Sequence, residues 1–311
     1  MKVSLNFLVI SLLLLCSCSG AKTSKVEVVN DVLPIADPYI LVDGDKYYAY
    51  GTFNPDGIDC YWSTDLEQWH YAGAALLKEN SYGDKWFWAP EVYNVGGKYY
   101  MFYSADLHMN VAVSDSPTGP FVQAEKKPLM EEPNIDTSVF FDTDGKAYLY
   151  YAHFTPNDGE YIHVVELNDD LLSIKPETDT YCIKAEEEWE LIWPKVVEGP
   201  SVLKKDDIYY LIYSANGYES HDYAIGVATA TSPLGPWTKS ADNPILRRYE
   251  GMVGVGHGAP FTDLQGKSHY VFHAHKSAEE VHPRTSFIVD MKVDSGKVSM
   301  GGGLIRPVVV K

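Results

Sequence analysis

Apolar positions along the chain occur in short runs, and no long segment places them at helical spacing between capping residues. The runs are rich in Tyr, Val, Ile and Phe, and Gly, Asp or Pro bounds them. This pattern is typical of β-strands separated by turns, because β-branched and aromatic side chains pack well on a pleated surface. The pattern therefore predicts an all-β protein.

One element, a tight turn followed by an aromatic strand, recurs five times. Its copies span residues 43–48, 96–100, 144–148, 206–210 and 265–270. In each copy Gly or Asp supplies the positive φ of a hairpin, which leads into the second strand of a unit. A domain over residues 26–311 divided by five gives roughly 57 residues per unit, close to a four-stranded propeller blade.

A second repeat supports this organisation. Residues 114–121 match residues 231–237, and residues 63–69 are a diverged copy. We expect these segments to be turns that leave the third strand of a blade. A β-sandwich with aromatic hairpins is the alternative, but five in-phase copies favour a five-bladed β-propeller with four-stranded antiparallel blades.

The repeat also aligns candidate chemistry. A count of nine or ten residues back from the turn lysine, or from its equivalent, reaches an ionisable residue in four of the five units: Asp37, Asp136, Glu198 and His257. In the other unit the count reaches Trp88 or Ala89. The first strands of propeller blades line the central axis, so these side chains are expected to converge at one mouth of the channel.

Three carboxyl groups gathered at one mouth must share protons or pair with a base, because a buried unpaired carboxylate is costly. Such crowding drives their pKa values apart, which is the electrostatic setting for a general acid beside a general base. For any one carboxyl, capping of a turn or a local ion pair is the alternative. For three at one repeat position, catalysis is the favoured interpretation.

The N-terminal segment has the features of an export signal. Lys2 precedes an apolar run over residues 7–15, which is too short to span a bilayer. Leu15 and Ser17, before Cys18, resemble a bacterial lipoprotein cleavage site. We expect removal of residues 1–17, lipidation of Cys18 and a polar tether over residues 18–25. The protein would then be anchored at the periplasmic or outer-membrane face, with plain secretion as the alternative.

Composition narrows the choice of partners. The chain has 25 basic and 43 acidic residues, a formal net charge of −18, which argues against binding to nucleic acid or to an anionic membrane surface. Aromatic residues make up 13% of the chain, which fits a sugar ligand and fits ordinary β-sheet equally. We expect an oligo- or polysaccharide substrate, a monomer, and membrane contact only through the lipid anchor.

Cys60 and Cys182 could pair in an oxidising compartment, although their spacing does not show a disulfide.

Four motifs, spread in order through the mature domain, resemble glycoside hydrolase family 43: Asp37 followed by Pro38 and Tyr39, residues 88–91, residues 135–140 and residues 197–200. The resemblance implies a five-bladed β-propeller and hydrolysis with inversion of anomeric configuration. It gives the role of general base to Asp37, that of general acid to Glu198, and tuning and orientation of that acid to Asp136. Thr137 is a departure, since Pro stands there in many relatives.

An inverting hydrolase needs its acid and base about 6.5–9.5 Å apart, so that a water molecule fits beneath the sugar. Asp37 would deprotonate this water as it attacks the anomeric carbon, and Glu198 would protonate the departing oxygen. An ionised Asp136 nearby would keep Glu198 protonated to higher pH by like-charge repulsion.

Two further residues take their interpretation from the resemblance. His257 would lie under the sugar site, near a central metal such as calcium, with a hydrogen-bonded core histidine as the alternative. Arg284 resembles a late arginine of the family that reaches the active-site carboxylates or the sugar hydroxyls, and a surface ion pair is the alternative. No cofactor is expected to be required.

Aromatic residues near these motifs are candidates for a wall of the sugar pocket. They are Phe53, Trp86 and Trp88, of which Trp88 is favoured because it begins the second motif. Glu91, at the end of that motif, is a candidate polar contact. Core packing is the alternative for the aromatic residues, and capping of a hairpin is the alternative for Glu91.

Other catalytic classes find less support. His269, His273 and His275 alternate on one strand, but no Cys pair or acidic partner stands at zinc-binding spacing, so a solvated or site-facing strand is expected. The chain has neither a Gly-x-Ser-x-Gly motif nor a His-Glu-x-x-His motif, which counts against a serine esterase and a zinc protease.

The sequence thus predicts a glycosidase that acts on plant-wall glycan. Common substrates in the family it resembles are α-L-arabinofuranosides, arabinan and β-xylosides. The chain ends one propeller's length after the signal and leaves no room for the β-sandwich appended in many xylosidases, which favours release of α-L-arabinofuranosyl units. A β-xylosidase, a β-galactoside-directed member and a non-catalytic glycan-binding lipoprotein are the alternatives.

Overall fold

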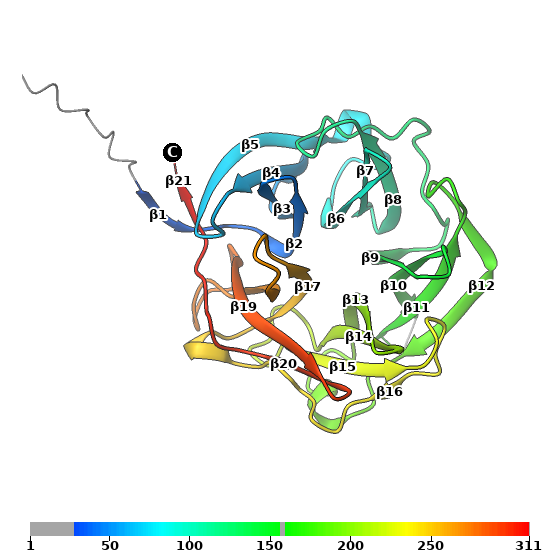
Figure 1. Cartoon of the computed structure of the whole chain (residues 1–311), viewed down its shortest axis with the longest axis vertical. Helices are drawn as coiled ribbons and strands as arrows, with labels where there is room; N and C mark the ends of the chain where they lie inside the picture. The colour runs from blue at the N-terminus through cyan, green and yellow to red at the C-terminus, as the bar shows by residue number, and fades with distance from the viewer. Residues whose placement is uncertain (1–27, 156–158, 311) are drawn as a thin grey trace, which may run out of the picture.

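The structure is a computed structural model that describes residues 28–155 and 159–310. The expected signal, Cys18 and the tether lie outside the described residues. Within them the chain forms β-strands and three single-turn 3-10 helices. The strands make five sheets around a central axis (Figure 1), which confirms the predicted all-β, five-bladed propeller. No helix in this part of the chain has the length and apolar character needed to cross a membrane.

The blades follow one another in chain order, and their first strands contact each other around the axis. Blade 1 contains β2 (Ala36–Asp43), β3 (Lys46–Thr52), β4 (Gly57–Ser63) and β5 (Gln68–Leu77). Blade 2 contains β6 (Trp88–Val95), β7 (Lys98–Ala105) and β8 (His108–Ser114). Blade 3 contains β9 (Asn134–Phe141), β10 (Ala147–Thr155), β11 (Gly159–Leu167) and β12 (Ile174–Ile183).

Blade 4 contains β13 (Val197–Lys205), β14 (Ile208–Ala215), β15 (Ala224–Ala230) and β16 (Thr238–Lys239). Blade 5 contains β17 (Gly256–Thr262), β18 (Ser268–Ala274), β19 (Thr285–Asp294) and β20 (Lys297–Met300). The short helices lie in connections and are η1 (Lys78–Asn80), η2 (Glu188–Glu190) and η3 (Tyr249–Gly251).

Two blades depart from the plain four-stranded form. In blade 2 a single bridge between Val113 and Val122 stands where a fourth strand would pair. The segment that follows, 123–133, is rich in charges and contains Pro128 and Pro133, which cannot donate to a ladder. On the outside of blade 1, β21 (Val308–Val310) pairs with β5 in parallel, and β1 (Val28–Val32) pairs with β21. The last strand of the chain therefore adds to its first blade and closes the ring.

The predicted hairpins are confirmed, and their aromatic strands are the second strands of the blades. Positive φ angles occur at the turns, including 51° at Asp206 and 60° at Asp207, where Asp adopts the conformation that Gly adopts in other turns. Most of the tyrosines that follow are buried, whereas Tyr48 and Tyr100 are half-buried. They belong to five hydrophobic clusters, and each cluster joins two neighbouring blades, including blade 5 to blade 1. The core thus lies between blades and leaves the axis to the polar residues of the first strands.

The two cysteines of the described residues do not form a disulfide. Cys60 lies in β4 and Cys182 in β12, so they belong to different blades, and both are buried free thiols. Burial raises the pKa of each thiol, to about 12 for Cys60, which keeps both protonated and chemically inert.

Candidate active site

Each first strand carries a β-bulge near its start, and the bulge directs a side chain to the axis. The bulged residue has a positive φ in every blade: 49° at Asp37, 42° at Ala89, 60° at Asp136, 56° at Gly199 and 37° at His257. A bulge bends its strand and re-aims the inserted residue, and bulges are common beside active sites. The five blades thus present equivalent positions at one mouth of the channel.

This geometry corrects the repeat alignment at blade 4. Gly199, and not Glu198, is equivalent to Asp37 and Asp136. The cause is hairpin length: blades 1, 2 and 4 have two-residue turns, as in the pair Lys205 and Ile208, whereas blades 3 and 5 have longer loops. The bulged residue therefore lies nine residues before the turn lysine or its equivalent in the first group, and ten residues before it in the second. Glu198 shares its position with Trp88, because each pairs with a serine one residue before the bulge.

The backbone N–H groups at the bulges are held from blade to blade. The acceptor is a side chain of the preceding blade's second strand: Thr52 Oγ1 for Ala89, Ser104 Oγ for Asp136, Ser214 Oγ for His257 and His273 Nδ1 for Asp37. Blade 3 has Ala152 at this position and offers no acceptor. The Gly199 N–H therefore donates to Asp136 Oδ2 at 3.2 Å. Because blade 3 lacks this acceptor, the Asp136 carboxyl is hydrogen-bonded to the strand that carries Glu198.

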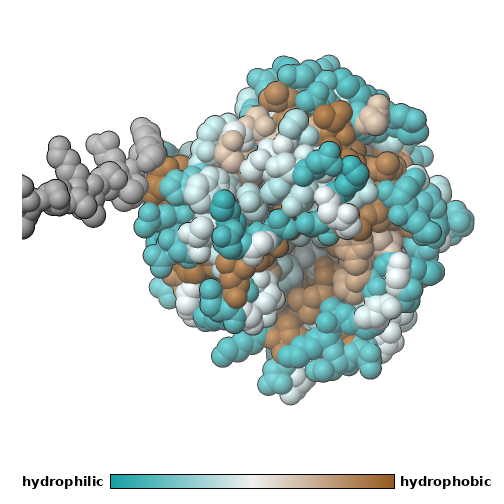
Figure 2. Space-filling view, turned by 45° about the horizontal axis from the view of Figure 1, so that its top comes forward, coloured by the Kyte–Doolittle hydropathy of each residue, from teal (hydrophilic) through white to brown (hydrophobic). Residues whose placement is uncertain are grey.

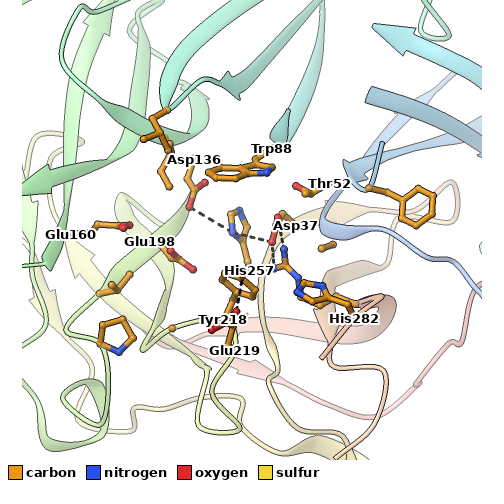
Figure 3. A pocket seen from close by; sticks show the side chains of 18 of the residues that line it. Asp37, Thr52, Trp88, Asp136, Glu160, Glu198, Tyr218, Glu219, His257 and His282 are labelled. Atoms are coloured by element: carbon orange, nitrogen blue, oxygen red, sulfur yellow. Dashed lines mark hydrogen bonds and ion pairs between the residues drawn. The ribbon is translucent and has the colours of Figure 1, made fainter. Parts of the chain in front are cut away.

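A cavity of about 850 Å³ opens at this mouth, and its lining combines acidic and aromatic side chains. Figure 2 shows the hollow, with hydrophobic residues along its walls. Seven of the residues singled out in the sequence line it: Asp37, Phe53, Trp88, Asp136, Glu198, His257 and Arg284. The carboxyls come from three different blades and point into one space (Figure 3).

Asp37 is surrounded by nitrogen atoms. Arg284 approaches its carboxylate with Nη1 2.9 Å from Oδ1 and Nη2 3.4 Å from Oδ2. The side chains of His257 and His273 lie 3.5 and 3.2 Å from Oδ1. Burial by itself would raise the pKa of Asp37, but Arg284 and then the two histidines hold it well below its usual range. Asp37 is therefore ionised at any pH where the protein functions.

Glu198 and Asp136 form a close pair with the opposite tendency. Carboxylate oxygens of the two residues lie within 4.8 Å of each other. Burial, opposed in part by a 2.6 Å hydrogen bond from the Tyr223 hydroxyl, raises the pKa of Glu198 to about 7. Burial and the charges of Glu198 and Asp37 raise the pKa of Asp136 well above its usual range. The pair therefore keeps a proton up to neutral pH, and its titration belongs to both carboxyls.

His257 lies between the two sides of the site. Its Nδ1 is 3.5 Å from Asp37 Oδ1 and 3.7 Å from Asp136 Oδ2 (Figure 3), and burial lowers its pKa. Asp136, Glu198 and His257 are close enough to share a metal ion. Two carboxyls and one imidazole supply fewer oxygen atoms than the six to eight that calcium binds, so these three residues by themselves do not make a calcium site. The cavity below His257 holds about 10 Å³, which limits it to one water molecule.

The aromatic candidates divide between the pocket and its surroundings. Trp88 is half-buried and lines the cavity, and Phe53 lines it with 52% of its surface exposed. Trp86 stands outside the lining and stacks on Trp88 with ring centroids 5.8 Å apart. Glu91 does not reach the pocket: it lies deeper along the axis, accepts a hydrogen bond from Tyr93, and has its pKa raised to about 8 by burial.

Several polar residues of the site escaped the sequence reasoning, among them Tyr223, His273 and Glu160. Tyr223 bonds Glu198, and its ring stacks on His273 with centroids 5.6 Å apart. His273 belonged to the alternating histidines expected to face a site, but its contact with Asp37 had no sequence signal. Glu160, at the start of β11, lines the cavity, and no motif or repeat position marks it.

Comparisons with known proteins agree with this geometry. The model of the glycosyl hydrolases family 43 matches residues 30–298. The chain is 27% identical to a β-D-galactofuranosidase of Aspergillus niger, over 80% of this chain and 76% of that protein. It is 24% identical to an extracellular exo-α-(1→5)-L-arabinofuranosidase of Cellvibrio japonicus, over 86% and 85%. A solved structure named as an endo-1,4-β-xylanase from Bacteroides thetaiotaomicron shares 50% identity and a TM-score of 0.88, covering 92% of this chain and 100% of that one.

Proposed function

The chain belongs to glycosyl hydrolases family 43 and is a glycoside hydrolase, and we propose that it releases α-L-arabinofuranosyl units from plant-wall glycan with inversion. The observation that carries the mechanism is the arrangement of three carboxyls around one cavity. One of them is held ionised, and the other two share protons up to neutral pH. This division of protonation states is what acid–base hydrolysis requires.

Asp37 is the general base in this proposal. Arg284 and the neighbouring histidines keep its carboxylate ionised and in one orientation. A water molecule between Asp37 and the sugar would lose its proton to this carboxylate as it attacks the anomeric carbon. Arg284 also stacks on Tyr218, with its guanidinium 4.3 Å from the ring centre, so a second residue of the pocket lining helps to hold the partner of the base.

Glu198 is the general acid, and Asp136 tunes it. With its pKa raised to about 7, Glu198 holds a proton in mildly acidic solution and can give it to the departing oxygen. The two carboxyls lie within 4.8 Å of each other, so ionisation of either one favours, by charge repulsion, the protonated form of the other. The Gly199 N–H holds Asp136 in place, which fixes the distance over which this repulsion acts.

The relatives support two classes of substrate. The two curated relatives described above are named for the release of furanosyl units, which supports an arabinofuranoside. The solved structure that shares half of its sequence with this chain is named as a β-xylanase, which makes β-xylosides the second candidate. Both kinds of substrate are neutral glycans, and both fit a cavity that joins aromatic walls to charged groups at its floor.

We expect turnover of para-nitrophenyl α-L-arabinofuranoside and of linear arabinan, with weaker action on the β-xyloside, the β-galactoside and xylan. The measurement is initial rates on this panel, followed by NMR of the first-formed product to assign its anomeric configuration. An inverted anomer supports the mechanism, and a retained anomer contradicts it. Preference for the β-xyloside would transfer the proposal to the second substrate. Tight glycan binding without turnover of any member would indicate a binding protein.

The pH dependence of kcat/KM should be asymmetric. Activity needs Glu198 protonated, so kcat/KM should fall as pH rises through about 7. The pKa of Asp37 is held well below its usual range, so kcat/KM should stay constant on the acidic side until the pH falls well below the ordinary pKa of an aspartate. The Tyr223 hydroxyl stabilises ionised Glu198, so Tyr223→Phe should move the basic limb to higher pH. Tyr71→Phe, an exposed tyrosine of β5, is the control. A basic limb that stays in place or moves down in Tyr223→Phe would contradict the assignment of Glu198.

We propose that the protein is exported and held at a membrane by lipid on Cys18. The support is the apolar run over residues 7–15 and the Leu, Ser and Cys residues at its end. A substrate too large to enter a cell fits an enzyme displayed at the periplasmic or outer-membrane face. We also propose that the protein is a monomer.

A further inference from the structure

The leaving-group side of the cavity contains two side chains that the catalytic proposal does not use. Glu160 and Trp193 both line the cavity, as does Glu198. The backbone of Glu160 forms a parallel bridge with Val196, two residues before Glu198. Figure 3 shows Glu160 beside Glu198, with Asp37 on the far side of His257. A sugar whose glycosidic oxygen takes the proton of Glu198 must therefore extend over Glu160.

Glu160 has an unused hydrogen-bonding atom. Its Oε2 is buried and has no hydrogen-bond partner among the described residues. Burial, together with the charge of Glu198, raises the pKa of Glu160 to about 8, so the side chain is a neutral acid in mildly acidic solution. A neutral carboxyl both donates and accepts hydrogen bonds, and a buried polar atom without a partner is unfavourable. A sugar hydroxyl satisfies both requirements.

Trp193 supplies an apolar surface to the same cavity, three residues before the Val196 that bridges Glu160. Its side chain is 66% exposed although it lines the cavity, so one face of the indole is open to a ligand. Its backbone is held in place: Asn216 Oδ1 accepts from the N–H groups of Ile192 and Trp193, and the Gly217 N–H donates to the Trp193 carbonyl. Asn216 is fully buried and also donates to the carbonyls of Trp189 and Asp222. The ring is thus presented from an anchored backbone.

We propose that Trp193 and Glu160 form the subsite for the sugar on the leaving-group side of the cleaved bond. The Trp193 ring stacks on the apolar face of that sugar, and the Glu160 carboxyl hydrogen-bonds one of its hydroxyls. The subsite selects a glycan chain over a small leaving group, so the enzyme prefers oligosaccharides with a further sugar beyond the cleavage point. This inference rests on the proposed function, because it takes the leaving side from the role of Glu198.

The test compares a ligand that reaches this subsite with one that does not. Trp193→Ala and Glu160→Ala should each lower kcat/KM about tenfold for the oligosaccharide that the wild type cleaves best. The inhibition constant of the released monosaccharide, which occupies the other side of the bond, should change by less than about twofold. Glu160→Gln retains an amide donor and should keep most of the activity. All rates are measured at about pH 5, where Glu198 is protonated in each variant.

Tyr71→Ala and Glu177→Ala are the controls, since both residues are exposed on outer strands and lie outside the cavity lining. Their kinetics should match the wild type. Equal losses for the oligosaccharide and the monosaccharide, or no loss for either, would overturn the subsite while leaving the proposed function intact. A wild type that cleaves no glycoside of the panel would overturn the proposed function, and the subsite with it.

Discussion

Glu198→Gln should abolish cleavage of natural glycans, with kcat lowered by roughly 10²–10⁴-fold. Glutamine has the shape of glutamate and can still accept the hydrogen bond from Tyr223, but it has no proton to give to the departing oxygen. The substitution also removes one of the two carboxyls of the Asp136 pair, so the fold should not be weakened by new charge repulsion. The measurement is the rate of arabinan or xylan hydrolysis alongside the melting temperature.

A leaving group that departs without a proton distinguishes a lost acid from a damaged site. With a dinitrophenyl glycoside, Glu198→Gln should retain much more of its activity than with the natural glycan. Glu177→Gln, which changes an exposed glutamate of β12, should behave as the wild type on both substrates. Near-wild-type cleavage of the natural glycan by Glu198→Gln would remove this residue from the role of acid.

Asp37→Asn should be the most damaging change at the site, because the attacking water loses the group that takes its proton. We expect kcat to fall by roughly 10²–10⁴-fold on every substrate, including those with good leaving groups. The variant also leaves the Arg284 guanidinium without its carboxylate partner in a buried position, so a lower melting temperature should accompany the loss. Asp45→Asn, at an exposed turn position, should change neither quantity.

Azide provides the decisive measurement for Asp37→Asn. It is a charged nucleophile that needs no deprotonation, so it should restore turnover of an aryl glycoside and yield a glycosyl azide of inverted configuration. Restoration by azide in Glu198→Gln but not in Asp37→Asn would reverse the two assignments. If azide restores neither variant, while both remain folded, Asp37 would act only in holding Arg284.

Much of the architecture was predictable, because it depends on local chemistry that repeats. Five turn-and-tyrosine segments each encode a hairpin, and the positive φ that Gly or Asp adopts there is a property of the residue itself. The same repeat located Asp37, Asp136 and His257 at equivalent bulges. The register failed at Glu198 because a count of ten was used in blade 4, whose turn has two residues, whereas ten applies only to the two blades with longer loops.

Contacts between blades could not be predicted in this way. Arg284 of blade 5 meets Asp37 of blade 1 at a sequence separation of 247, and even within blade 4 Tyr223 meets Glu198 at a separation of 25. No periodicity links such positions, since the two partners of each pair occupy different places in the repeat. Glu160 acquires its raised pKa only because β11 lies next to the strand that carries Glu198. Ala152 has no hydroxyl to accept the Gly199 N–H, which donates to Asp136 instead. Nothing in the local sequence around Ala152 indicates this contact.

The amino-acid sequence by itself determined the strand pattern, the five units, and the acidic residues that stand near the inner ends of three of them. These properties follow from side-chain size, turn preference and spacing, all of which act over a few neighbouring residues. Only the tertiary structure decided which carboxyl is ionised and which is protonated. Protonation depends on burial and on charges a few ångströms away, and closure of the ring brings those charges together from the two ends of the chain.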